Sequence, residues 1–152
     1  MIAQIRSFLD HDFAKLLEID QICFQPRIAY DAAALHHFLY QIDSHALVLI
    51  SDSGVVGFGI AAVTGSRANR VEGHIITLDL LPQARGHGYG RELLRRLEEN
   101  LADDGAAAVF LEVDARNSQA IGFYLKMGYR ERRRLRNYYG RGRDAIEMTS
   151  PL

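Results

Sequence analysis

The chain contains a single cysteine, Cys23, and therefore cannot form an intrachain disulfide framework. Within the run Ile22-Cys23-Phe24, this thiol is expected to pack as a small apolar side chain rather than act as a nucleophile. No stretch reaches the ~18 consecutive apolar residues of a membrane-spanning helix, and the N-terminal residues lack the apolar core of a signal peptide. We therefore expect a cytoplasmic protein with no membrane partner.

An excess of charge of either sign is also absent, since 18 basic and 19 acidic residues give a formal net charge of −1. The basic run Arg132-Arg133-Arg134, followed by Arg136, is the one local exception. On a strand, alternation divides these side chains between two faces. We interpret the run as a solvated sheet face or a contact with an anionic acceptor, and we predict no nucleic-acid partner.

Metal-binding and nucleotide-binding motifs are missing as well. The six histidines show no ligand spacing with carboxylates or thiols, so we predict no metal. The run Arg85-Gly86-His87-Gly88-Tyr89-Gly90 lacks the Gly-Lys-Ser/Thr of a P-loop. It also lacks the third glycine of the dinucleotide fingerprint, because that position holds Leu93.

The length of 152 residues suits one domain spanning residues 1–152, with strands and helices alternating along it. Hydrophobic periodicity predicts strands over residues 2–8, 46–50, 55–63, 74–81, 107–113, 129–138 and 144–149. Helices are expected from Asp10 or Asp12 to Ile22, from Asp31 through Leu39, after Gly90, and after Asn117. Residues 65–73 are predicted to form a polar loop.

The segment 85–90 connects a predicted strand to a helix and has the properties of an anion site. Amide N–H groups of a first helical turn point outward, and the helix dipole adds roughly half a positive charge there. Gly88 and Gly90 have no Cβ, so a phosphate can approach the backbone closely. The helix that follows carries its leucines on one stripe and Arg91, Arg95, Glu98 and Glu99 on the opposite side.

The pattern Arg85-x-x-Gly88-x-Gly90 resembles the pyrophosphate loop of the GNAT family, the acetyl-CoA-dependent N-acetyltransferases. One βα unit later, Asn117-x-x-Ala120-x-x-Phe123-Tyr124 precedes Gly128-Tyr129, which is similar to the second half of the GNAT core. Together the two motifs are more specific than either alone. They imply an α/β (α+β) GNAT fold, in which about four helices flank a mixed, mostly antiparallel sheet of about seven strands.

Within the family, the C-terminal half is most similar to the bacterial ribosomal-protein alanine N-acetyltransferases. The residues that carry this likeness are Leu111-Glu112-Val113-x-Ala115-x-Asn117, Ala120-Ile121-x-x-Tyr124 and Arg136-Asn137-Tyr138-Tyr139 before Asp144-Ala145-Ile146. Those enzymes have an aromatic residue after Phe-Pro, whereas this chain has Phe24-Gln25-Pro26-Arg27, and its last hairpin is shorter. Both differences fall on the side that shapes the acceptor site in that family.

The resemblance implies a general base and a general acid. It places a catalytic glutamate at Glu112, although a strand-end carboxylate facing solvent would fit the same position. His74, Glu72 and Asp79 are alternative bases, and strand alternation leaves open that Asp79 faces solvent. Tyr124 matches the family's tyrosine acid, while a core aromatic residue would also fit there.

The same resemblance implies a set of residues that hold acetyl-CoA as the acetyl donor. Backbone N–H groups around Leu78 to Leu80 are expected to bind the developing oxyanion, and Asn117 to bind pantetheine or phosphate, or only to cap its helix. The predicted cofactor-binding residues are Leu78, Asp79, Leu80, Arg85, Gly86, His87, Gly88, Tyr89, Gly90, Asn117 and Tyr124.

The implied function is direct acetyl transfer from acetyl-CoA to a primary amine, because no covalent nucleophile signature is present. The segment Asn137-Tyr138-Tyr139 favours a peptide or protein N-terminus over a small-molecule amine as acceptor. The alternatives are a non-catalytic module that binds acyl-CoA, which retention of Glu112 and Tyr124 disfavours, and a nucleotide-phosphate binder. A monomer or a homodimer is expected.

Overall fold

The computed structural model describes residues 3–26, 28–67 and 70–152. The strands are β1 (Gln4–Ser7), β2 (His45–Ser51), β3 (Gly54–Arg67), β4 (Arg70–Leu80), β5 (Ala108–Asp114), β6 (Arg130–Leu135) and β7 (Ala145–Pro151). The α-helices are α1 (Phe13–Cys23), α2 (Ala32–Tyr40), α3 (Tyr89–Asp103) and α4 (Ser118–Lys126). This order confirms the predicted one; Ile2, where the first strand was predicted to begin, lies outside the described residues.

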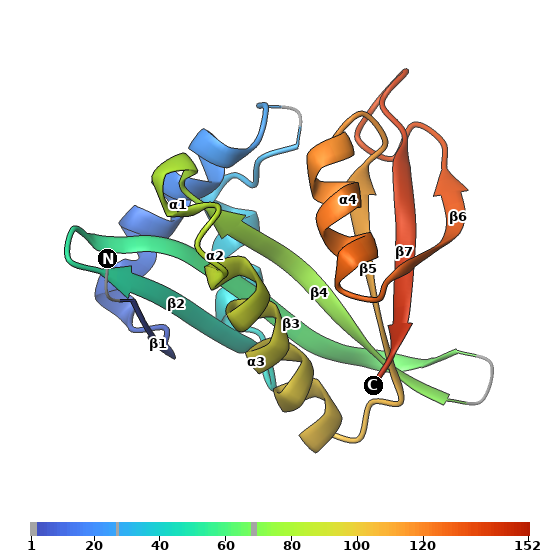
Figure 1. Ribbon diagram of the computed structural model, residues 1–152, viewed down its shortest axis with the longest axis horizontal. Coiled ribbons are helices and arrows are strands. Elements are labelled where there is room, and N and C mark those ends of the chain that lie inside the picture. Colours follow the sequence, from blue (N-terminus) through green and yellow to red (C-terminus); the bar gives the residue numbers. More distant parts are fainter. Residues whose placement is uncertain (1–2, 27, 68–69) are drawn as a thin grey trace.

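Within the described residues, the strands form one seven-stranded sheet in the order β1-β2-β3-β4-β5-β7-β6 (Figure 1). Neighbouring strands are antiparallel except β4 and β5, which run parallel. The predicted fold class, a mixed and mostly antiparallel sheet flanked by four helices, is thereby confirmed.

The parallel pair is joined along only part of its length. Residues Glu72 to His74 of β4 pair with Ala108 to Phe110 of β5, and the two strands separate beyond that point (Figure 1). Beyond this point, within the described part of the chain, β4 continues to Leu80 paired only with β3, and β5 continues to Asp114 paired only with β7, so their facing edges are not paired with each other. The cavity described below lies at this separation.

The helices cover the sheet in two layers. Helices α3 and α4 pack on one face and build one hydrophobic cluster, whereas α1 and α2 build a second cluster with residues of β2, β3 and β4. The predicted stripe of α3 is fully buried, and its members are Leu93, Leu94, Leu97 and Leu101. Each leucine withdrawn from water in this way contributes roughly 1.5–3 kcal/mol.

Glu98 does not lie opposite the leucine stripe of α3, where it was predicted. It is buried, and its carboxylate accepts hydrogen bonds from the Tyr129 hydroxyl at 2.6 Å and from the Arg95 guanidinium at 2.7 Å. Helical periodicity places Glu98 beside the leucine stripe but does not show that a distant tyrosine reaches it. The prediction that Glu98 lies on the side opposite the leucines was therefore wrong.

The polar segment 65–73 was predicted as a loop and instead belongs mostly to strands. Strand β3 continues to Arg67 and β4 begins at Arg70, with Ser66 paired to Val71. Ladder hydrogen bonds come from the backbone, so a hairpin can extend through polar residues without an apolar pattern. In the last hairpin the strand is shorter than predicted, because β6 ends at Leu135 rather than at Tyr138.

The predicted helix caps are confirmed in part. Asp31 caps α2, since its side chain accepts the Ala34 N–H at 2.8 Å. Asp12 precedes α1 but does not cap it, because its carboxylate accepts the Leu9 N–H and pairs with Arg6 instead.

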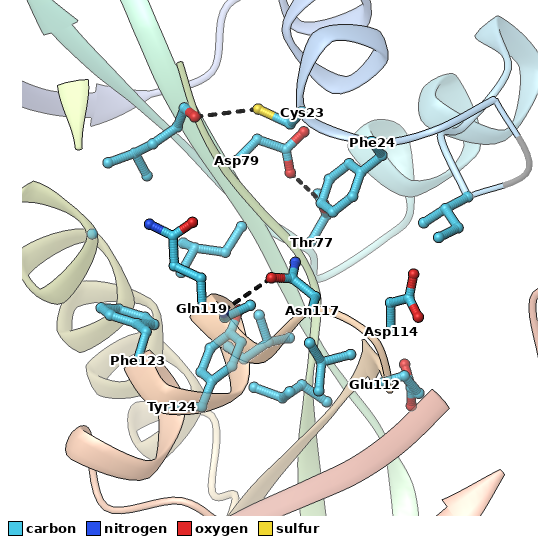
Figure 2. A pocket seen from close by; sticks show the side chains of 18 of the residues that line it. Cys23, Phe24, Thr77, Asp79, Glu112, Asp114, Asn117, Gln119, Phe123 and Tyr124 are labelled. Carbon is cyan, nitrogen blue, oxygen red and sulfur yellow. Dashed lines mark hydrogen bonds between the residues drawn. The ribbon is translucent and has the colours of Figure 1, made fainter. Parts of the chain in front are cut away.

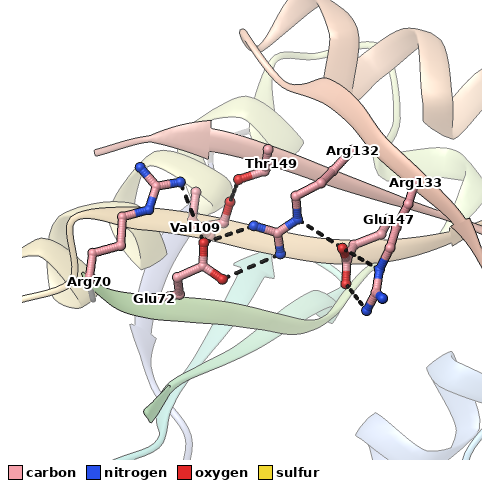
Figure 3. A network of polar contacts seen from close by, with 7 residues as sticks. All are labelled: Arg70, Glu72, Val109, Arg132, Arg133, Glu147 and Thr149. Atoms are coloured by element: carbon pink, nitrogen blue, oxygen red, sulfur yellow. Dashed lines mark hydrogen bonds and ion pairs between the residues drawn. The ribbon is translucent and has the colours of Figure 1, made fainter. Parts of the chain in front are cut away.

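A buried ionic network crosses the sheet from β4 to β6 (Figure 3). The Arg132 guanidinium donates to Glu72 and to Glu147, each at 2.8 Å, and both carboxylates are almost fully buried. Arg133 also bonds Glu147, because the register of β6 against β7 shifts between Glu131 and Arg133. The expected simple alternation of the arginine run was therefore wrong at this irregularity.

Of the helices in the described part of the chain, none is long and apolar enough to cross a membrane.

Candidate active site

A cavity of about 940 Å³ lies where β4 and β5 separate. Figure 2 shows side chains of both strands and of α4 around it. The residues of β4, β5 and α4 predicted for the site that line the cavity are Leu78, Asp79, Leu80, Glu112, Asn117 and Tyr124. Arg85, Gly86, Gly88 and Gly90 of the predicted anion loop line it too, whereas His87 and Tyr89 are outside the lining.

Glu112 is held by a histidine of the neighbouring strand. Nε2 of His74 lies 2.7 Å from Oε1 of Glu112, and the side chain of Glu112 is 12% exposed. The His74 ring stacks on Phe110 with a centroid distance of 4.5 Å and an interplanar angle of 6°. Glu112 is therefore a partly buried, oriented carboxylate rather than a strand-end group in solvent.

Tyr124 presents its ring to the core and also lines the cavity. The ring makes edge contacts with Phe123 and Tyr129. Burial, and then the negative charge of Asp79, raise the pKa of the Tyr124 hydroxyl above its ordinary value. Tyr124 therefore keeps its proton at neutral pH, as a proton donor must.

The glycine-rich loop has the open backbone that the sequence predicts. Gly86 and Gly88 adopt φ angles of +81° and +82°, and a Cβ built on either would meet no atom within 4 Å. The first turn of α3 follows directly, with Glu92 N–H bonded to the Gly88 carbonyl. A helix N-terminus and Arg85 thus face one cavity, an arrangement that fits the phosphates of a CoA derivative.

Asn117 has the capping role that was weighed for it. Its side-chain oxygen accepts the Ala120 N–H at 3.1 Å at the start of α4. Asn117 also lines the cavity, so the cap places its amide beside any ligand there.

Asp79 does not face solvent, because it is 1% exposed and lies against the fully buried Asp20 of α1. The Thr77 hydroxyl donates to one oxygen of Asp79, and the Tyr30 N–H donates to one oxygen of Asp20. Burial, and then the hydrogen bond and charge of Asp20, raise the pKa of Asp79 well above its ordinary value. Asp79 is therefore expected to keep its proton to a higher pH than an exposed aspartate does.

The remaining alternative base, Glu72, is not in the cavity lining. It is 2% exposed and is occupied by Arg132 and Arg70 in the network described above.

A family model described as the acetyltransferase (GNAT) family matches residues 12–129. The chain belongs to this acetyltransferase family. This confirms the predicted recognition and enzyme class, an N-acetyltransferase, and with them the expectation that acetyl-CoA is the acetyl donor.

Individual relatives of this acetyltransferase cover from 70% to nearly all of the chain. It is 31% identical to an N-alpha-acetyltransferase of Sulfurisphaera tokodaii, over 91% of this chain and 90% of that protein. It is 32% identical to the [ribosomal protein bS18]-alanine N-acetyltransferase of Salmonella typhimurium, over 70% of each. The crystal structure of the Escherichia coli ribosomal-protein-S18-alanine N-acetyltransferase superposes with a TM-score of 0.83 and 26% identity, covering 99% of this chain and 94% of that one.

The structure adds residues to the acetyltransferase site that the sequence reasoning missed. They are Asp20 of α1, Tyr30 of the α1–α2 connection and Arg143 of the β6–β7 loop. Gln25 and Tyr139, which the sequence analysis had associated with the acceptor side, line the cavity as well. The sequence did indicate that Asp20 is unusual, because it lies four residues after Leu16 on the apolar stripe of α1. A charged residue is rarely buried unless it has a partner or a function. Arg143 carried no such signal, since its partners are distant in sequence.

Proposed function

We propose that this acetyltransferase acetylates the free amino terminus of a peptide or protein, with Glu112 as general base and Tyr124 as general acid. The observation that carries the proposal is the placement of both groups in one cavity, where β4 and β5 separate. Bound acetyl-CoA supplies the acetyl group as a thioester. The chain's own residues orient the two substrates and move the protons.

The donor is held by the loop and helix that open toward the cavity. Gly86, Gly88 and the start of α3 offer backbone N–H groups to phosphate, and Arg85 adds a positive charge. Asn117 and residues 78–80 of β4 line the same cavity as that loop and Glu112. We propose that Asn117 and residues 78–80 contact the donor.

Glu112 accepts the proton that the acceptor ammonium must lose. A terminal ammonium has a pKa of about 8, so at neutral pH most N-termini are protonated and must lose a proton before they can attack the thioester. The Glu112 carboxylate takes this proton directly or through a water, while the hydrogen bond to His74 holds the carboxylate in place. Glu72 is unsuited because arginines occupy it, and Asp79 because its raised pKa favours the neutral acid.

Tyr124 donates a proton to the departing sulfur. Its raised pKa keeps the hydroxyl protonated until a strong base, the thiolate, forms beside it. The ring contacts with Phe123 and Tyr129 fix the direction of the hydroxyl, which favours a single transfer geometry.

Two observations favour a peptide acceptor. Relatives of comparable length are named N-alpha-acetyltransferase and ribosomal-protein alanine N-acetyltransferase. Tyr139 lines the cavity and Tyr138 lies near Glu112, which, after burial, helps to raise the pKa of Tyr138 to about 12. We further propose that the chain works as one domain, as a monomer or homodimer, in the cytoplasm, where newly made N-termini are available.

The first experiment measures CoA release from acetyl-CoA, with mass detection of the product, in two acceptor pools. One pool holds peptides with free N-termini, including those that start with alanine; the other holds polyamines, amino sugars and amino acids. Selective acetylation of peptides supports the proposal. Turnover only in the second pool refutes a peptide acceptor. Acetyl-CoA binding without transfer to either pool refutes acetylation of peptides and of small-molecule amines alike.

The second experiment replaces the base. Glu112→Gln keeps a hydrogen-bonding partner for His74 but cannot accept a proton, so kcat is expected to fall ~100-fold or more. His74→Asn should cause a smaller loss, because His74 orients Glu112. The reverse ranking would make His74 the base and Glu112 its support.

A further inference from the structure

Arg143 connects three parts of the chain at the acceptor end of the cavity. Its guanidinium Nη1 donates to the side-chain oxygen of Gln25 at 2.6 Å, and Nη2 donates to Asp114 Oδ2 at 2.5 Å. Gln25 belongs to the α1–α2 connection, Asp114 ends β5, and Arg143 itself closes the β6–β7 loop. All three residues line the cavity.

The position of Arg143 is coupled to that of Glu112. Asp114 is two residues after Glu112 on the same strand, so the two carboxylates project from the same face of the sheet. The backbone of Arg143 also fixes the loop above them, since its carbonyl accepts the Tyr139 N–H and its own N–H bonds the Gly140 carbonyl, each at 3.0 Å. Arg143 therefore holds Tyr139 and the β6–β7 loop relative to the strand that carries Glu112.

The burial of Arg143 makes this arrangement specific. The side chain is 9% exposed, and among the described residues its Nε–H has no hydrogen-bond partner. Within the described part of the chain, Gln25 and Asp114 are therefore the side chains that hold the guanidinium. A lysine ammonium lacks the planar fork that bonds two partners in fixed directions.

We propose that Arg143 is a positioning residue for the acceptor, holding the α1–α2 connection and the β6–β7 loop in register with Glu112. This inference rests on the proposed function, because it requires an acceptor amine at Glu112. It also gives a role to Gln25, at which the chain departs from the ribosomal-protein acetyltransferases that it resembles. The residues placed on the donor side, the glycine loop and Asn117, share no hydrogen bond with the Arg143 side chain.

The test is steady-state kinetics of four variants, Arg143→Gln, Arg143→Lys, Gln25→Ala and the double variant R143K/Q25A, on whichever acceptor the wild type acetylates. Arg143→Gln should raise the KM for the acceptor about tenfold or more, the scale of losing one hydrogen bond to a charged group. The KM for acetyl-CoA should not change. Arg134→Gln is the matched control, because Arg134 pairs with Asp144 in the same hairpin but is half exposed and outside the cavity lining.

The conservative variants separate positioning from general destabilisation. Arg143→Lys keeps an ion pair with Asp114 and loses the bond to Gln25, so it should match Gln25→Ala in acceptor KM. The double variant should then have the same acceptor KM as Arg143→Lys, because each single change already breaks the same hydrogen bond between residues 143 and 25. Gln25 is exposed, so Gln25→Ala retains the test even if Arg143→Gln does not fold.

The outcomes distinguish this inference from the function on which it rests. Equal rises in KM for both substrates, additive effects in the double variant, or an unchanged acceptor KM overturn the role of Arg143 while leaving the enzyme assignment intact. Wild-type turnover confined to small amines refutes the peptide acceptor, and the same four variants then decide the role of Arg143 on those amines. A wild-type protein that acetylates neither pool overturns both.

Discussion

At the scale of single residues, two tyrosines in one aromatic cluster have different surroundings. Tyr124 lines the cavity, whereas the Tyr129 hydroxyl donates to the buried carboxylate of Glu98. Their rings are in edge contact, with centroids 5.6 Å apart. The pair therefore offers the same chemical change, removal of a phenol hydroxyl, at the position proposed as catalytic and at a structural position.

Tyr124→Phe is expected to lower kcat ~100-fold or more, because it removes the proton donor while keeping the ring and its packing. Tyr129→Phe should leave kcat unchanged and lower the free energy of unfolding by about 1–3 kcal/mol, because it leaves Glu98 short of a donor. Steady-state kinetics and urea unfolding of both variants check this contrast. Unchanged turnover in Tyr124→Phe would remove the acid from the mechanism.

Asp79 gives the residue-scale prediction for pH dependence. Burial and Asp20 raise its pKa in the folded state, so the native protein binds this proton more tightly than the unfolded chain does. Its contribution to stability is therefore fully present below the unfolded pKa of about 4 and is lost as pH rises toward the raised pKa. The difference in unfolding free energy between wild type and Asp79→Asn should accordingly decrease from acidic toward neutral pH.

Asp144 provides a control of opposite sign. Hydrogen bonds from the Asn137 N–H and from Arg134 hold the pKa of Asp144 below its ordinary value. Its contribution is present above the unfolded pKa and is lost as pH falls through the folded pKa. Urea unfolding across pH should therefore give opposite trends for Asp79→Asn and Asp144→Asn, and parallel trends would contradict the raised pKa of Asp79.

At the scale of elements, the entry into α3 depends on backbone conformation more than on space. Gly88 immediately precedes the helix with a φ of +82°, whereas a Cβ at Gly90 would meet the Phe123 ring at an ordinary 3.5 Å. The two glycines of the motif therefore have different reasons to be glycine. The left-handed conformation requires the first, and the second is a glycine at which we propose that a phosphate approaches the backbone.

Gly88→Ala is expected to lower stability by roughly 1–2 kcal/mol, the cost of a left-handed conformation for a residue with a Cβ. Gly90→Ala should change it by less than about 0.5 kcal/mol, because its φ is ordinary and its contact mild. Thermal unfolding with and without acetyl-CoA measures both, and Gly88→Ala should also weaken the stabilisation by acetyl-CoA. Equal melting temperatures for the two variants would contradict the conformational argument.

At the scale of the whole molecule, the buried network holds the part of the sheet where β4 and β5 still pair. Glu72 of β4 and Glu147 of β7 lie on either side of β5, and Arg132 bonds both from the edge strand β6 (Figure 3). The Arg132 guanidinium also lies over the Phe110 ring at 5.4 Å, and Phe110 stacks on His74. The network therefore connects the edge of the sheet to the histidine that holds Glu112.

Arg132→Met is expected to lower the free energy of unfolding by about 3 kcal/mol, because it leaves two buried carboxylates short of their main partner. Arg133→Met is the control and should cost less than about 1 kcal/mol, since Arg133 is 55% exposed and Arg132 still serves Glu147. Urea unfolding of the two variants measures both losses of unfolding free energy. Similar losses would show that the network is no stronger than a surface ion pair.

The features that the sequence predicted correctly are those set by neighbours along the chain. The leucine stripe of α3, the caps at Asp31 and Asn117, and the glycine turn into α3 each depend on spacing within a few residues. The α3 stripe is buried because its period matches the helix, and the caps form because an unpaired N–H lies three residues away. Family resemblance added Glu112 and Tyr124, whose roles stay predictions.

The sequence by itself determined the order of the elements, the enzyme family and the residues of the two motifs. Only the tertiary structure decided how β4 and β5 separate, which carboxylates are buried, and that Arg143 meets Gln25, 118 residues away. The physical reason is that hydrogen bonds and ion pairs of this kind depend on distances between segments that no local period encodes. Glu98, Asp79 and Arg143 acquire their surroundings from residues brought together by the packing of helices on a twisted sheet.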